Sequence, residues 1–192
     1  MTDVAAAADR SPRTAPQPPH PRRAEIVAAL ARDPRRMTVQ LARELGVPEE
    51  QVIRALPAGR VTELDASRWE ELLRGLEPLG KVHVIVTNGA VTLEAFGTFG
   101  NFSTFGEYFN VQTKDLDMHI RPSTLGAAFA VEKPGHLDGV NTLSFQFYDR
   151  NGAAAFKVFL TFGGANPPAA KVDAFVAIRE RFALPGGAGS GE

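Results

Sequence analysis

The sequence predicts an α+β domain, in which a largely antiparallel sheet of seven to nine strands is flanked by N-terminal helices and one C-terminal helix. Two observations carry this prediction. Over much of residues 81–162, apolar and polar residues alternate with a period of two, as in half-buried strands, and Asn-Gly steps interrupt the alternation as hairpin turns do. Before and after that stretch, the apolar residues instead recur with the spacing of one helix face.

Composition divides the chain into four segments. Residues 1–22 contain almost no large apolar side chain, so they cannot bury enough surface to offset the entropy of ordering, and a disordered tail is predicted. Residues 23–80 are predicted to form a helical leader packed on the sheet. Residues 81–184 are predicted to form the β domain with its closing helix, and the glycine-rich residues 185–192 a flexible tail.

The helical leader contains several start and stop signals. Thr38 is predicted to cap a helix that ends at Gly46, and Pro48 to open the next one. Asp65 or Ser67 is predicted to cap a further helix. The two short helices around Gly46 also have the shape of a helix-turn-helix, so a DNA-binding regulator is one alternative function. Against it, the second of these helices begins with two glutamates, which would face phosphates badly.

Two predicted hairpins frame the β segment. The first turns at Asn88-Gly89 and the second at residues 149–152, where Asn and Gly accept the positive φ that such turns need. In the second hairpin, the face predicted to form the core carries Leu143, Phe145, Phe147, Phe156, Val158, Leu160 and Phe162. The opposite face carries Thr142, Ser144, Gln146, Tyr148, Ala155, Lys157, Phe159 and Thr161. This mixed face is typical of a ligand-binding surface as much as of a solvent-facing one.

A glycine-rich loop between the hairpins places three phenylalanines at regular spacing. Phe99, Phe102 and Phe105 are three residues apart. Rings in such a loop pack beneath it as a satellite core, or they form one wall of an apolar pocket for a flat conjugated ligand. Both interpretations stay open from the sequence.

Several segments, in a fixed order, resemble one protein family. They are the stretch Leu41 to Gly80, the hairpin Lys81 to Gly97, the motifs Tyr108-Phe109-Asn110 and Met118-His119-Ile120, and a final strand A-x-F-K-V-F-L after an Asn-Gly turn. In this order, residues 38–162 resemble the HutX/ChuX-type haem utilisation carriers. The resemblance implies a homodimer whose sheets form a saddle, and a cytoplasmic protein that binds and transfers haem or a haem-like tetrapyrrole without turnover. It also implies a haem-receiving enzyme as a partner, and a haem-degrading enzyme of the same broad group is an alternative.

Two side chains are candidates for binding haem iron. His119 lies on the same strand face as Arg121, and an imidazole that binds iron beside a guanidinium that pairs with a propionate suits haem. The alternative for His119 is a surface histidine satisfied by a carboxylate. Tyr108 is the second candidate, because phenolate holds ferric haem, although an ordinary strand aromatic fits its position equally well. Lys157 is expected to hold a propionate or merely to protect the sheet edge.

The sequence departs from the resembled family at two places. Many members have a histidine where Thr87 stands, and many continue the last strand with Gly-Arg-Asp, where residues 161–164 read TFGG. His83 shares a face with Thr87 but lies four residues earlier, about 13 Å along a strand, so it is interpreted as a half-buried strand residue instead of a substitute ligand. The departures predict weaker or single-sided haem binding, or binding of another tetrapyrrole.

Charge and cysteine content narrow the functional classes. The net charge of −1 gives no overall field that would attract nucleic acid or anionic lipid. The chain has no cysteine, which excludes disulfides, thiolate ligation of haem and cysteine-based zinc sites. No apolar run approaches the roughly 18 residues of a membrane span, and the N-terminus does not resemble a signal peptide, so the cytoplasm is the expected location.

Overall fold

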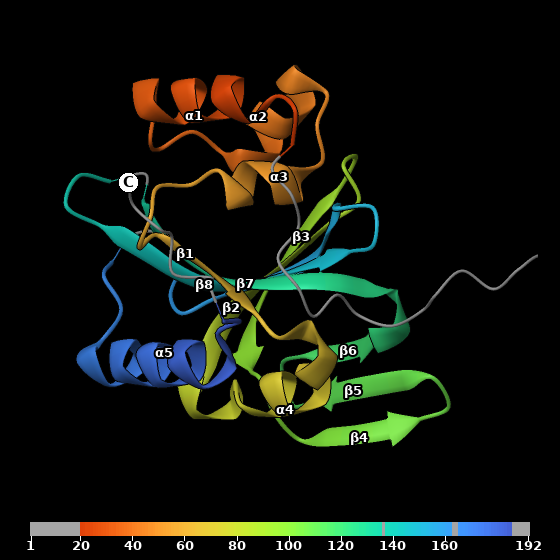
Figure 1. Cartoon of the computed structure of the whole chain (residues 1–192). Coiled ribbons are helices and arrows are strands. Elements are labelled where there is room, and N and C mark those ends of the chain that lie inside the picture. Colours follow the sequence, from red (N-terminus) through yellow and green to blue (C-terminus); the bar gives the residue numbers. More distant parts are fainter. Residues whose placement is uncertain (1–19, 136, 163–164, 186–192) are drawn as a thin grey trace, which may run out of the picture.

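The computed structural model describes residues 20–135, 137–162 and 165–185 (Figure 1). Most of the two predicted tails, 1–22 and 185–192, lies outside these ranges. Within them, nine strands form two sheets in which every pairing between strands is antiparallel. Helices from both ends of the chain pack on the sheets. The predicted α+β class is therefore confirmed.

The larger sheet has six strands and the smaller one three. In spatial order, the larger sheet contains β1 (Val61–Leu64), β7 (Leu125–Pro134), β8 (Asn141–Asp149), β9 (Ala154–Phe159), β2 (Lys81–Thr87) and β3 (Thr92–Thr98). The smaller sheet contains β4 (Phe102–Phe105), β5 (Tyr108–Gln112) and β6 (Asp117–Ile120). Strand β1 lies inside the segment predicted to be helical. Its four residues are too few to show a period, and pairing with β7 holds them extended.

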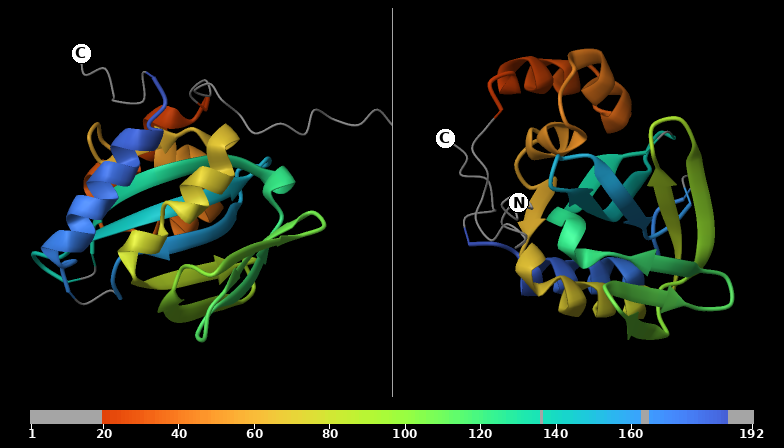
Figure 2. Two further views of the ribbon diagram at one scale, coloured as in Figure 1. Left: turned by 90° about the horizontal axis from the view of Figure 1, so that it is seen from below. Right: turned by 90° about the vertical axis from the view of Figure 1, so that its right-hand side faces the viewer.

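Two groups of helices lie on opposite faces of the larger sheet (Figure 2). On one face, α1 (Arg23–Arg32), α2 (Thr38–Leu45) and α3 (Glu49–Arg54) pack over Phe129, Val131 and Tyr148. On the other face, α4 (Trp69–Arg74) and α5 (Ala169–Phe182) cover the main core. Three 3₁₀ turns connect these elements: η1 (Ala66–Arg68), η2 (Glu77–Leu79) and η3 (Pro122–Thr124).

The helix termini follow the sequence signals only in part. Gly46 ends α2 with a φ of 62°, and Pro48 directly precedes α3. Asp65 caps η1, which leads into α4, by accepting a hydrogen bond from the Ser67 N–H at 3.0 Å. Thr38, however, is not the cap of α2. It is the first residue of that helix, and its hydroxyl donates to the Glu49 carboxylate at 2.6 Å. Thr38 and Glu49 are both buried, so the Thr38 hydroxyl satisfies the Glu49 carboxylate of α3 and does not cap its own helix.

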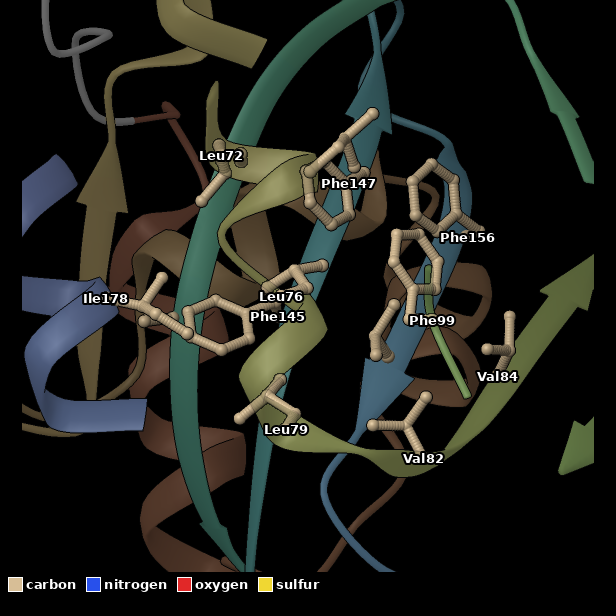
Figure 3. Close-up of a cluster of buried hydrophobic side chains, with 14 of the residues drawn as sticks. Leu72, Leu76, Leu79, Val82, Val84, Phe99, Phe145, Phe147, Phe156 and Ile178 are labelled. Atoms are coloured by element: carbon tan, nitrogen blue, oxygen red, sulfur yellow. The ribbon is translucent and has the colours of Figure 1, made fainter. Parts of the chain in front are cut away.

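The main core lies between the larger sheet, α4, α5 and the inner face of the smaller sheet (Figure 3). Phe145 and Phe147 of β8 point into it, as the alternation predicts, and Phe145 packs on Phe175 of α5 with ring centroids 4.9 Å apart. Phe109 of β5 brings the smaller sheet in, with its ring edge-to-face against Trp69 at 5.4 Å. The small sheet is therefore fixed by its inner face, and its outer face is left for other contacts.

The turn between β8 and β9 is held against the leader at one glycine. Gly152 has a φ of 78°, and its carbonyl accepts a hydrogen bond from the Glu50 N–H at 3.1 Å. A Cβ at this position would lie 2.8 Å from the Pro48 Cβ and 2.9 Å from a Glu50 carboxylate oxygen. The predicted Gly turn thus has a second role, because it lets the start of α3 approach the sheet closely.

We predict that Gly152→Ala lowers the free energy of unfolding by about 2–5 kcal/mol, since a left-handed φ costs about 1–2 kcal/mol and overpacking about 1–3 kcal/mol. Gly89→Ala is the matched control. Gly89 also has a positive φ, 91°, but its Cβ would meet only an Arg43 side-chain nitrogen at 3.4 Å. Denaturant titration of both variants measures the difference. Equal losses of stability in the two variants would show that the close approach of Gly152 to α3 adds nothing to the cost of the substitution.

Candidate functional site

A cleft of about 930 Å³ lies between α2 and the part of the larger sheet that the leader helices leave open. Its size is near the upper end of the range of small-molecule sites, roughly 300–1,000 Å³. From the helical side, the cleft is lined by Met37, Thr38, Val39, Gln40 and Arg43. From β2, β3, β8 and β9, its lining includes His83, Ile85, Glu94, Ser144, Gln146, Lys157 and Phe159.

The mixed polar face predicted for the last hairpin forms the floor of this cleft. Ser144, Gln146 and Lys157 line it together, as a period of two requires. A chain of hydrogen bonds continues from the floor under the leader: the Tyr148 hydroxyl donates to Gln146 at 2.7 Å, and the Gln146 amide donates to Ser144 at 3.0 Å. Burial, together with the charges of Glu49 and Glu50, raises the pKa of Tyr148 well above its ordinary value. Tyr148 is therefore a fixed neutral donor.

Lys157 is already paired within the protein. Its ammonium lies 2.5 Å from the Glu49 carboxylate, and the Lys157 and Glu49 side chains are only 12% and 5% exposed. The Thr38 hydroxyl donates to the same Glu49 oxygen. Removing the lysine charge would leave a buried carboxylate without its cation, which is strongly unfavourable. Lys157 therefore joins the leader to β9, and a ligand carboxylate would have to share it with Glu49.

His83 lies in an aromatic cluster at one end of the cleft. It is buried, at 6% exposed, and its ring stacks on Phe96 with centroids 4.5 Å apart and lies 5.3 Å from Phe162. Its Nε2 is 3.0 Å from a Glu94 carboxylate oxygen. The alternation predicts Phe162 on the core face, and this prediction is wrong. Phe162 lies on the cleft side, because β9 ends at Phe159 and the alternation, which still places Leu160 in the core, does not reach Phe162.

Lys133 is a cleft residue that the sequence patterns do not single out. Among the described residues, no carboxylate or carbonyl accepts a hydrogen bond from its ammonium. Burial lowers the pKa of Lys133 to about 8, and the charge of Asp33 opposes that shift only in part. The sequence offers a weak signal for it, because Glu132 and Lys133 interrupt an otherwise apolar strand.

The predicted iron ligands lie elsewhere, on the outer face of the smaller sheet. His119 of β6 pairs with Asn110 of β5, and Tyr108 lies two residues along β5 on the same face. The rings of Tyr108 and His119 are edge-to-face, with centroids 6.4 Å apart. The His119 side chain is 56% exposed. The structure therefore brings the two predicted donors together on an open surface outside the cleft.

Asn110 fixes the orientation of the His119 ring. The His119 Nδ1 lies 2.7 Å from the Asn110 side-chain oxygen, and the Asn110 amide nitrogen donates to the Ser103 hydroxyl at 3.1 Å. Because the Asn110 oxygen can only accept, this arrangement favours the proton on Nδ1 and leaves Nε2 as the ring nitrogen that could bind a metal. Asp117 lies 3.5 Å from Nε2 and pairs with the ring when it is protonated.

The other predicted site residues divide between this outer face, the cleft and the core. Phe105, 81% exposed, pairs across β4 and β5 with Tyr108, and Arg121 makes a 3.5 Å contact with exposed Glu107. Phe99 is fully buried in the core. Phe102 is partly buried, and its ring stacks on that of Phe109 at 5.4 Å. The loop rings Phe99 and Phe102 thus pack beneath the small sheet and do not line the cleft.

We predict that Lys133→Met raises the free energy of unfolding at pH 7 by about 1 kcal/mol, because the substitution removes the cost of burying an unpaired charge. This magnitude is reduced for the solvent that still reaches Lys133. Below pH 8, both the folded and the unfolded chain hold the lysine proton, so the full cost is present. Between pH 8 and the ordinary pKa of 10.5 the unfolded chain holds more protons, so the stability of the unsubstituted protein rises with pH. The variant should lack this rise.

The control for Lys133→Met is the same change at the other cleft lysine. Lys157→Met should destabilise the protein by about 3 kcal/mol, because it leaves Glu49 buried and unpaired. Denaturant titrations from pH 6 to 10.5 measure both variants. A loss of stability in Lys133→Met would contradict the assignment of Lys133 as an unpaired, destabilising cation.

The sequence and the structure both match proteins of one family. The family model described as haem utilisation ChuX/HutX matches residues 62–178, more than half of the chain. A protein of Vibrio cholerae serotype O1, named intracellular heme transport protein HutX, is 25% identical over 138 residues, which are 71% of this chain and 70% of the relative.

Solved structures agree with this match. A crystal structure of a protein from Erwinia carotovora superposes with a TM-score of 0.74 at 26% identity, over 82% of this chain and 98% of the other. The crystal structure of ChuX superposes with a TM-score of 0.71 at 21% identity, over 81% and 96% of the two chains, and shares the fold. The chain belongs to the haem utilisation ChuX/HutX family.

Proposed function

We propose that this chain binds haem, or a haem-like tetrapyrrole, and passes it on during haem utilisation without chemical turnover. Membership of the ChuX/HutX family supports haem as the ligand, and the relative from Vibrio cholerae is named as an intracellular transport protein for it. We propose the cytoplasm as the place of transfer and a haem-receiving enzyme as the partner. In the described part of the chain, no helix is both long and apolar enough to cross a membrane.

One observation carries the proposed position of the iron. On the outer face of the small sheet, the half-exposed ring of His119 is held through Nδ1 by Asn110, which leaves Nε2 as the candidate donor, and the ring lies beside Tyr108. Imidazole and phenolate are both established ligands of haem iron. Arg121, at the end of the same strand, would pair with a propionate, and the exposed ring of Phe105 would cover part of the macrocycle.

An open face holds haem weakly unless something covers the other side of the ring. We propose that the working form is a homodimer and that the second copy supplies this cover, since an exposed aromatic such as Phe105 is typical of an interface. Weak ligation suits a carrier, because it has to release its ligand. The molar mass in solution, with and without haemin, tests the dimer.

The geometry of α3 does not favour the DNA-binding alternative. Glu49 and Glu50 are buried, and α3 packs against the larger sheet and the β8–β9 turn. A recognition helix needs an exposed face that enters a groove.

We predict that haemin titration of the purified protein produces a saturable Soret band. His119→Ala and Tyr108→Phe should each weaken the affinity about tenfold or more, since each removes a direct donor to iron. His20 lies outside the cleft and outside the outer face of the small sheet. His20→Ala is therefore the matched histidine control and should bind haemin as the unsubstituted protein does. His83→Gln separates the two surfaces. Loss of the band in His83→Gln, with His119→Ala unchanged, would place the iron in the cleft and refute our assignment.

The carrier and the haem-degrading enzyme differ in the fate of the bound haem. We predict that the haem complex, incubated with ascorbate and oxygen in the presence of catalase, keeps its Soret band, because a carrier returns its ligand unchanged. Haemin-loaded albumin at the same haemin concentration, without this protein, serves as the control for non-specific decay. Decay of the band with release of iron in the complex alone would favour the enzyme.

A further inference from the structure

Lys133 stands where the cover of the leader helices ends and the open cleft begins. It follows Phe129 and Val131 on the same face of β7, and these two side chains are buried beneath the leader. Lys133 itself is half-buried and lines the cleft. Its amine is therefore partly removed from water but can still be reached by a small molecule that enters the cavity.

The other described lysines have a different surrounding. Lys157 and Lys171 are also half-buried, but Lys157 is held by a carboxylate of α3 at 2.5 Å, and Lys171 donates to backbone carbonyls. Lys81 and Lys114 are exposed, so water solvates their ammonium groups. Lys133 combines partial burial with the lack of a hydrogen-bond acceptor within the described ranges. Its charged form is therefore the least favoured of the five.

Partial burial without a partner makes the Lys133 amine a better nucleophile at neutral pH. Only the neutral amine has a lone pair that can attack a carbonyl carbon, and desolvation is an established way to activate a lysine for this reaction. Burial lowers the pKa of Lys133 to about 8, and the charge of Asp33, at the end of α1, opposes the shift only in part. At pH 7, about a tenth of the amine is then neutral, against less than about a thousandth for an ordinary lysine.

The surroundings of this amine indicate the kind of carbonyl compound that would reach it. Met37, Pro134 and Leu137 line the same cleft and offer apolar surface to the body of a ligand. Three further cations, two arginines and Lys157, line the cleft, against the one carboxylate of Glu94 among its described lining residues. An excess of positive charge in a cavity attracts anions. An aldehyde with an apolar ring and an anionic group fits both features.

We infer that Lys133 is a covalent binding residue, whose amine forms a reversible imine with an anionic aromatic aldehyde that enters the cleft. The amine nitrogen attacks the carbonyl carbon, and a C–N bond forms to give a carbinolamine. The two protons of the amine then leave with the carbonyl oxygen as water, so the step needs no oxidant or reductant. The assignment is independent of the proposed function, because neither iron nor a tetrapyrrole takes part in it.

Reductive trapping with 4-formylbenzoate and cyanoborohydride at pH 7 tests the inference. Peptide mapping by mass spectrometry should find Lys133 labelled at least about tenfold faster than exposed Lys81, because far more of its amine is neutral. The rate should saturate with the concentration of 4-formylbenzoate, as binding before reaction requires. Mapping also separates Lys133 from the α-amino group, whose ordinary pKa is close to 8.

Lys133→Arg is the decisive variant, because it keeps the cation and removes the nucleophile. It should abolish the fast, saturable adduct, whereas Lys81→Arg, the matched change at an exposed lysine of β2 outside the cleft, should leave that adduct unchanged. Labelling of Lys133 no faster than that of Lys81, a rate that rises linearly without saturation, or a fast adduct that persists in Lys133→Arg would each overturn the inference.

Benzaldehyde tests the anionic part of the assignment, because it has the same ring as 4-formylbenzoate but no carboxylate. It should need at least about tenfold higher concentration to reach half of its maximal labelling rate at Lys133, since it lacks the attraction of the cleft cations. Equal half-saturation by the two aldehydes would refute a preference for anionic ligands.

Discussion

The ion pairs of α3 determine whether this molecule has a cleft at all. Glu49 is held by Lys157 of β9, and Arg54 lies between Glu50 and Glu63, at 2.8 Å from the Glu50 carboxylate. All these side chains are nearly buried, so breaking one pair costs far more than an exposed pair would. The pairs tie the leader to the sheet, and the leader supplies the wall of the cleft that α2 forms. The Gly152 turn completes this attachment by its close approach to Pro48 and Glu50.

The structure separates two kinds of chemistry that a haem protein usually combines. The outer face of the small sheet has an oriented imidazole and a phenol but no enclosing walls. The cleft has walls, an apolar end and several cations, but the His83 imidazole, the one described histidine that lines it, is already within hydrogen-bond distance of Glu94. Thr87 lines this same cleft and offers no nitrogen donor. The histidine of the Met118-His119-Ile120 motif lies on the outer face instead.

Local patterns predict the fold well, because the second hairpin, the apolar faces of the helices and the Asn-Gly turns are each determined by residues that lie close together in the sequence. The mixed face of Ser144, Gln146 and Lys157 is predicted correctly for this reason. Three features depend on long-range contacts and are not readable from local patterns. The pairing of β1 with β7 and the ion pair of Lys157 with Glu49 of α3 each join segments far apart in the chain. The burial of Lys133, near Asp33, likewise depends on a distant segment. The position of Phe162 fails differently, because periodicity ends where its strand ends. The roles of His119 and Tyr108 stay predictions.

The two walls of the cleft come from distant parts of the chain. Residues 37–43 form one wall, and β9, which ends at Phe159, completes the other. During synthesis, the ribosome therefore makes the first wall more than a hundred residues before its counterpart exists. A nascent chain therefore has no complete cleft until β9 has been synthesised and has paired with β8.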